Sequence, residues 1–292
     1  MNRRSHLALL AGSLAGTAFR SPAQTPAGSL TNVSAGSFHV SVPQSWAAGA
    51  IVEKVASLPL YSAEAWQKLQ ENPLCQLKPF YGNRPEHWAI RFPALALKGE
   101  MFNAKEAGAD PTAPQILIHQ NGGWASIMKN GEHNANATAR SQAELRSALT
   151  ALGQSAEGDI TPAYMDASLT FTCLKKKLNF KGGQGYRVVT QWTIEPELVR
   201  RGSLHYLFVG LSDDDTCQII ATFPLDMPEL PSAGIEAEHL GYSAKRYADL
   251  TRDMSAYSAK AASWLESRAS NFTPSLDSLD QLMESLSAET WR

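Results

Sequence analysis

The chain has few cysteines, little excess charge and no apolar run long enough to cross a bilayer. Three cysteines in 292 residues are too few for a disulfide framework, and the 20 glycines show no period of three, which excludes a collagen-like protein. The formal net charge of −2 gives no reason to expect a nucleic-acid-binding protein. Hydrophobic residues make up 43% of the chain, so it can fill a core and is not wholly disordered.

Residues 1–23 have the pattern of an export signal peptide. Arg3 and Arg4 form a basic start, residues 7–19 are apolar or small without a charge, and residues 21–23 offer a cleavage site. The apolar stretch is well short of the ~20 residues needed to span a bilayer. Residues 2–7 resemble a twin-arginine signal, although His6 stands where a bulky residue is usual, so general secretion is the alternative. We therefore expect an exported protein, periplasmic or extracellular, with no integral membrane span in the mature chain.

Removal of this segment changes the net charge, and export bears on the redox state of the cysteines. It holds three arginines and no acids, which leaves 23 basic and 28 acidic residues, or −5, in the remainder. That acidity argues further against a nucleic-acid partner. Cys75, Cys173 and Cys217 lie among apolar neighbours, which favours buried free thiols, although an exported protein could pair two of them.

The rest of the chain is predicted to be a linker over 24–35 and one α+β domain over 36–292. Alternating apolar residues predict strands at 38–42, 88–92 and 115–119. A helix is expected from Ser62 to Pro73. Residues 129–139 are polar and Asn-rich, which indicates a loop, and Ser141 with Glu144 forms a capping box for a helix ending at Gly153.

The C-terminal half is predicted to be an antiparallel meander followed by two helices. Strands are expected at 169–180, 186–194, 204–211 and 217–223, joined by turns at 182–185 and 212–215. Apolar spacings of three and four predict one helix over 247–264 and another that starts at Thr273–Pro274. We expect a sheet of five to seven strands packed against these C-terminal helices.

Several segments of this half occur together in a known pattern. They are LNF (178–180), GQGYRVVTQ (183–191), YLFVGLSDD (206–214), ATFPL (221–225) and PELP (228–231). The set resembles a family of uncharacterised exported or lipid-anchored bacterial proteins with the motifs "YLxFxNGxGxRxxTQ" and "YxFxGLTxDGxYxxxAxxPVxxPxLP". The resemblance spans about 36–287. The family's Asp-Gly turn is Asp214–Asp215 here, and 129–139 looks like an insertion. With no established activity in the family, the resemblance implies export and fold, not a reaction.

Two groups of residues are candidates for a binding site. Arg187 and Gln191 lie four apart on one predicted strand and face one side with Val189 between them, so they could line a polar binding surface or form ordinary cross-strand pairs. Tryptophans could rim a groove for a glycan or peptide, although burial is their commonest fate; the candidates are Trp46, Trp88, Trp124 and Trp192. His119 ends a predicted strand and is a weaker binding candidate.

Other motifs do not carry a site. Ser126 and Lys129 match the S-x-x-K of penicillin-recognising enzymes, but Asn130–Gly131 follows at once and the partner motifs are in the wrong order. The histidines lack helical metal-ligand spacing, and Asp213–Asp215 fits a solvated turn better than a calcium loop, so we expect no metal and no cofactor.

The sequence favours a non-catalytic binding or interaction module of the cell envelope, with a protein or glycan of the envelope as its partner. The alternative is an envelope hydrolase that uses Ser126 or a His–Asp pair.

Overall fold

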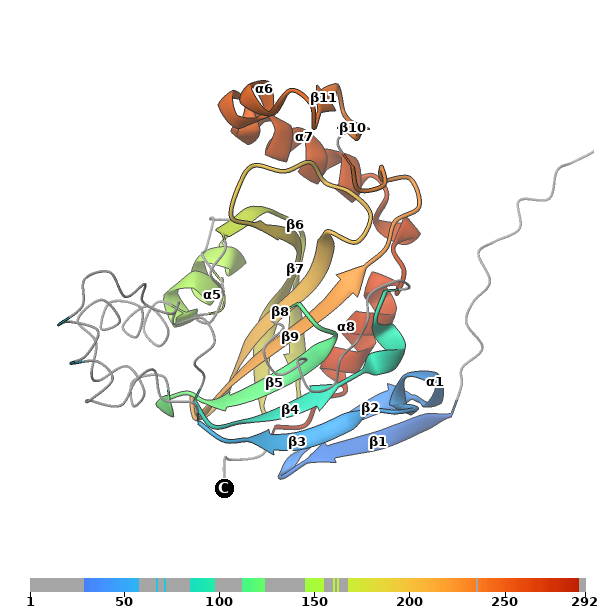
Figure 1. Ribbon diagram of the computed structural model, residues 1–292. Helices are drawn as coiled ribbons and strands as arrows, with labels where there is room; N and C mark the ends of the chain where they lie inside the picture. The colour runs from blue at the N-terminus through green and yellow to red at the C-terminus, as the bar shows by residue number, and fades with distance from the viewer. Residues whose placement is uncertain are drawn as a thin grey trace, which may run out of the picture.

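The protein is built around an antiparallel sheet (Figure 1). The structure, a computed structural model, describes residues 29–57, 67, 71, 85–97, 112–123, 145–154, 160, 162, 168–234 and 236–288. Within these ranges a seven-stranded sheet has the order β3 (Ile51–Val55), β4 (His87–Arg91), β5 (Gln115–Gln120), β9 (Cys217–Leu225), β8 (Leu204–Ser212), β7 (Gly183–Thr193) and β6 (Ser168–Phe180). Strands β6 to β9 pair in chain order, which confirms the predicted meander and the α+β fold.

A separate hairpin precedes the sheet and corrects the predicted linker. β1 (Leu30–Ala35) pairs with β2 (Phe38–Pro43) along its whole length, so the last six residues assigned to a linker over 24–35 form a strand. Polar residues obscure the alternation in β1, but Ala35 is fully buried. Gly36 has a φ of +62°, which suits the tight turn between the two strands. A short helix, α1 (Gln44–Ala47), follows.

One face of the sheet packs against the C-terminal helices. These are α6 (Tyr247–Arg252), α7 (Met254–Glu266) and α8 (Leu276–Glu284). A small hairpin of β10 (Glu238–His239) and β11 (Tyr242–Ser243) precedes them, and the 3₁₀ turn η4 (Ala269–Asn271) lies between α7 and α8. A second 3₁₀ turn, η2 (Pro93–Leu95), follows β4. Apolar residues of alternate strand positions meet one stripe of α7 and α8 and form the larger core. Its fully buried members include Tyr206, Phe208, Phe223, Tyr257, Leu265, Leu279 and Met283.

Two predicted helix boundaries are wrong. The helix expected over 247–264 is broken at Asp253, whose φ of −106° ends α6 and whose carboxylate accepts from Arg252 Nε at 3.1 Å. The last helix begins at Leu276 rather than at Thr273–Pro274, because Ser275 is its N-cap and accepts from the Ser278 amide at 3.2 Å.

The first turn of the meander is shorter than the glycine pattern indicates. β7 begins at Gly183, so the turn is Lys181–Gly182, not 182–185, and Gly182 adopts a φ of +88°. Gly183 and Gly185 are strand residues. A Cβ at either would collide with an aromatic ring, that of Phe180 at Gly183 and that of Phe208 at Gly185. These glycines permit close packing and do not make the turn.

The opposite face of the sheet carries α5 (Leu145–Gly153), which lies over the meander strands (Figure 1). Leu145 and Ala148 are buried there in a second, smaller core with Val188, Leu207 and Ile220. The prediction of a helix that ends at Gly153 is confirmed.

Cys173 and Cys217 are buried and neither forms a disulfide, as expected. Cys75, the helix expected over most of 62–73, the 129–139 segment and the Ser141–Glu144 capping box lie outside the described residues, as does the predicted signal peptide. In the part of the chain that the structure describes, no helix is both long and apolar enough for a membrane span.

Candidate functional site

A groove of about 340 Å³ lies between α5 and the meander. One wall is the exposed side of α5, with Arg146, Thr150 and Gln154. The floor comes from neighbouring strands β6 and β7, and the second wall is the turn between β8 and β9. Residues from the floor and second wall include Lys177, Gln184, Tyr186, Ser212 and Asp213. Ligand pockets of small molecules have volumes of about 300–1,000 Å³, so the groove has room for a compact ligand.

The position of α5 depends on a close approach to the floor. Leu145 and Ala148 anchor the helix in the smaller core, and Leu149 packs against the same core from a partly buried position. At the end of the helix Gly153 faces Tyr186. A Cβ at residue 153 would overlap the Tyr186 hydroxyl and lie 3.5 Å from its Cζ. The absence of a side chain at Gly153 therefore lets the helix end rest on the tyrosine that forms the floor.

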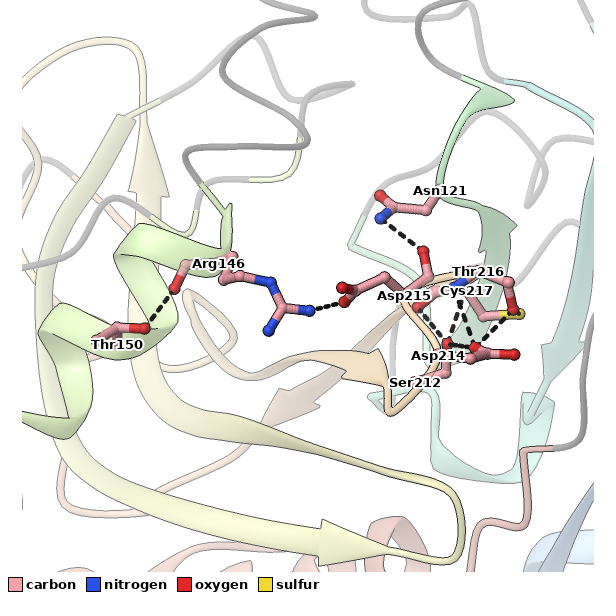
Figure 2. Close-up of polar contacts among 8 residues, drawn as sticks. All are labelled: Asn121, Arg146, Thr150, Ser212, Asp214, Asp215, Thr216 and Cys217. Carbon is pink, nitrogen blue, oxygen red and sulfur yellow. Dashed lines mark hydrogen bonds and ion pairs between the residues drawn. The ribbon is translucent and has the colours of Figure 1, made fainter.

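The β8–β9 turn is held by a hydrogen-bond network centred on Asp214 (Figure 2). The Asp214 carboxylate accepts from Ser212 Oγ at 2.7 Å, from Thr216 Oγ1 at 2.8 Å and from the Thr216 amide at 3.1 Å. These hydrogen bonds, that from Ser212 first, hold the pKa of Asp214 below its usual value. The Cys217 amide donates to Ser212 Oγ at 2.9 Å. The turn predicted at 212–215 is confirmed, with its carboxylate used inside the turn.

Asp215 links this turn to α5. Its φ of +59° is the left-handed conformation that glycine or aspartate tolerates, at the position where the resembling motif has glycine. Its carboxylate forms an ion pair with Arg146 of α5, and its carbonyl accepts from Asn121 Nδ2 at 2.9 Å (Figure 2). The ion pair spans from one wall of the groove to the turn that forms the other.

The groove offers hydrogen-bond donors and acceptors in near balance. Arg146 is neutralised by Asp215, whereas Lys177 has no ion-pair or hydrogen-bond partner among the residues that the structure describes. Lys177 and Tyr186 are direct cross-strand partners, so ammonium and phenol lie side by side on the floor. The amides of Gln154 and Gln184 each supply a donor and an acceptor. This arrangement suits a ligand rich in hydroxyl groups.

The predicted site residue Arg187 lies on the other face of the sheet, together with Gln191. The prediction that the two share one face is confirmed by their alternation with Val188 and Thr190, but both are buried beneath the helices. The Arg187 guanidinium donates to Asp280 of α8 through Nε at 3.1 Å and Nη2 at 3.0 Å, and Nη1 donates to the Leu174 carbonyl. Gln191 Nε2 donates to the Leu198 carbonyl at 3.4 Å. The pair therefore forms internal contacts and no open surface.

His119 and Trp192 lie on the α5 face but apart from the groove lining. The His119 side chain is 0% exposed, and its ring centroid lies 4.7 Å from that of His87 on the neighbouring strand. The Trp192 ring is tilted against that of His205, with the ring centroids 4.9 Å apart. Trp46 and Trp88 pack against the larger core, whereas Trp192 belongs to the smaller one, so these three do not rim a common groove. Trp124 and Ser126 lie outside the described residues.

The groove residues themselves were not singled out from the sequence. The available signal for the groove was the run Lys175–Lys177 on a predicted strand. Successive side chains of a strand point to opposite faces of the sheet, so at least one of these lysines must point toward whatever packs on each face. Lys176 turns toward α8, where Nζ donates to Asp280 at 2.8 Å, and Lys177 turns toward α5. Nothing in the sequence pattern shows that α5 packs there.

Comparisons with protein-family models, curated proteins and solved structures give no match to this chain. Across the described ranges, no group of three or more histidine, cysteine, aspartate or glutamate side chains is placed to hold a metal ion.

Proposed function

We propose that the protein is an exported, non-catalytic binding module of the cell envelope and that it binds a glycan in the groove between α5 and the meander. The observation that carries the proposal is the composition of the groove: a lysine with no partner among the described residues, two side-chain amides and a tyrosine around about 340 Å³. A sugar ring presents hydroxyl groups that donate and accept, and it has apolar C–H faces that pack on an aromatic ring. The groove provides a counterpart for each of these features.

Export is supported by the order of charged, apolar and small residues over 1–23 and by the resemblance to exported or lipid-anchored bacterial proteins. Replacing Arg3 and Arg4 together by lysine tests the route. We expect the full-size precursor to accumulate inside cells if the twin-arginine pathway is used. Unchanged processing would favour general secretion, and retention of the intact wild-type chain in the cytoplasm would contradict export.

Binding is favoured over hydrolysis by the state of the groove hydroxyls. Ser212 Oγ accepts from the Cys217 amide and donates to the Asp214 carboxylate, whose lowered pKa makes it a poor base for activating a nucleophile. A serine–histidine contact occurs in the β1–β2 hairpin, Ser34 Oγ to His39 Nδ1 at 2.8 Å, but it is exposed and no described carboxylate orients that histidine. A hydrolase would need a third group to orient the histidine.

The test is isothermal titration calorimetry of the purified protein with two sets of saccharides. One set is soluble peptidoglycan fragments from a lysozyme digest, and the other is neutral glucose oligosaccharides. We expect saturable binding to at least one saccharide set. Lys177→Ala removes a charge-assisted hydrogen bond of about 1.5–3 kcal/mol and should weaken binding roughly tenfold or more. Lys175→Ala is the matched control, because Lys175 is exposed on the same strand but does not line the groove.

Mass spectrometry of the recovered saccharides separates binding from catalysis. Intact saccharides support a binding module, and shortened ones would support the hydrolase. Equal affinities for wild type and Lys177→Ala would show that the groove is not the site, and no binding in either set would contradict the glycan proposal.

A further inference from the structure

A row of buried polar side chains crosses the sheet on the α5 face, outside the groove. Arg91 of β4, Gln115 of β5 and Thr222 of β9 are successive cross-strand partners, and each is about 1% exposed. They share a face with Ala89, Leu117 and Ile220 of the smaller core, two residues away on the same strands. None of the three lines the groove.

The guanidinium of Arg91 uses only one of its edges. Nη1 forms an ion pair with Glu53 on the edge strand β3, and Glu53 is 46% exposed. Nε and Nη2 are buried and have no hydrogen-bond partner among the described residues. The same is true of Thr222 Oγ1. Nε–H and Nη2–H point in the same direction, and together they form the planar fork that binds two oxygens of one carboxylate or phosphate.

A buried arginine with two empty donors is unfavourable unless something compensates it. Arginine keeps its charge in proteins, so the group cannot relieve the strain of burial by losing a proton. A half-exposed glutamate at the other edge compensates the charge in part and leaves both donors without acceptors. One oxyanion would satisfy both N–H groups with parallel bonds, and Thr222 could donate to a third oxygen.

We propose that Arg91 and Thr222 form a second binding site, which holds a carboxylate or phosphate group through the Nε–Nη2 edge of Arg91. The partly exposed Glu53 places the site next to the β3 edge of the sheet. The site is independent of the glycan groove, because it shares no residue with it, and it stands if the proposed function fails.

The first test is thermal unfolding of the purified full chain with sodium phosphate or sodium acetate, at constant ionic strength maintained with chloride. At an anion concentration a hundredfold above Kd we expect Tm to rise by roughly 5 °C or more. A response to phosphate alone assigns a phosphate ester, and a response to acetate assigns a carboxylate. No rise with either anion overturns the proposal.

Variants locate the effect. Arg91→Lys keeps the charge but loses the fork, so the rise in Tm should disappear. Glu53→Gln removes the competing carboxylate and should lower the anion Kd several-fold. Arg201→Lys is the matched control, because Arg201 forms an exposed forked pair with Asp226 and should leave the response unchanged. A full response in Arg91→Lys overturns the proposal.

NMR of the wild-type protein decides the question even if Arg91→Lys does not fold. The Arg91 Nε–H resonance, identified by its shift in Glu53→Gln, should move downfield and saturate with the same Kd as the rise in Tm. An Nε–H resonance that does not move during the titration overturns the proposal.

Discussion

Replacement of Asp280 by asparagine measures how strongly α8 is held to the sheet. Asp280 is 1% exposed and lies opposite β6, β7 and β8. Its carboxylate accepts from Lys176 Nζ at 2.8 Å, from Arg187 Nε at 3.1 Å and from the Tyr206 hydroxyl at 3.1 Å. These three side chains come from three adjacent strands, so a single carboxylate connects the C-terminal helix to three of the seven strands of the sheet.

The loss in Asp280→Asn should be large because Arg187 is left behind. The Arg187 side chain is 7% exposed and, in the variant, keeps the Leu174 carbonyl and one uncharged amide oxygen as acceptors, so its buried charge loses its counter-charge. Breaking a buried ion pair by removing one partner lowers the free energy of unfolding by about 3–5 kcal/mol. Urea unfolding followed by circular dichroism checks this value. Asp277→Asn is the control, since Asp277 is exposed on the same helix and should lose at most about 1 kcal/mol.

The same carboxylate sets an acid limit of stability. Burial alone would raise the pKa of Asp280, but hydrogen bonds from Arg187 and Lys176 hold it below its ordinary value. Its contribution is therefore complete above the unfolded pKa of about 3.9 and is lost as pH falls through the lower folded value. Asp280→Asn should lack this acid-dependent loss. A stability change below 1 kcal/mol at pH 7, or an unchanged acid profile, would refute the reasoning.

Three further perturbations test other contacts. Gly153→Ala should lower the free energy of unfolding, measured by urea denaturation, by about 1–3 kcal/mol, because the new methyl group meets the Tyr186 hydroxyl. Adding Tyr186→Phe to this variant should recover most of the loss. Additive effects of the two substitutions would contradict this. Burial lowers the pKa of His239 to about 4 from 6.5, so stability should fall by roughly 3 kcal/mol as pH drops through this interval. A His239→Gln variant with the same pH profile would exclude His239 as the cause. Burial, followed by the charge of Glu266, raises the pKa of Cys173 to about 12, so peptide mapping after iodoacetamide treatment at pH 8 should find Cys173 unmodified until the protein is unfolded. Rapid labelling of the folded protein would contradict the buried thiol.

The strands of the meander could be predicted because their information is local. The segments 204–212 and 217–225 are rich in β-branched, aromatic and other apolar residues, although Gly210 and Pro224 interrupt them, and Ser212–Asp215 between them supplies turn chemistry. The strand β1 was missed because its sequence LTNVSA has weak alternation and its backbone is paired by β2. The helix break at Asp253 similarly depends on backbone geometry at one residue.

The candidate sites were harder to predict because they join residues that are distant in the sequence. Alternation shows that Arg187 and Gln191 share a face, but not that α8 covers that face with Asp280, 93 residues away from Arg187. Likewise Lys177 and Tyr186 become neighbours through the register of one hairpin, whereas Arg146 and Gln154 join them only because α5 packs on that side. A single sequence holds no signal for these choices of face.

The two faces of the sheet differ in how their buried charges are paired. On the α7–α8 face the buried charges are compensated, since Asp280 has three donors and Arg187 has acceptors for Nε, Nη1 and Nη2. On the α5 face, Arg91 and Thr222 keep buried donors that no described residue satisfies, and Lys177 has no described partner. Each unsatisfied buried group costs about 1–3 kcal/mol, so a face selected for stability alone would carry apolar residues in place of Arg91 and Thr222, whereas the exposed Lys177 has no such cost. Asp280→Asn should therefore lower stability with little change in saccharide or anion Kd at temperatures where the variant is folded, whereas Lys177→Ala should weaken saccharide binding with little change in stability. Variants that alter both properties together would show that the faces are not separate in function.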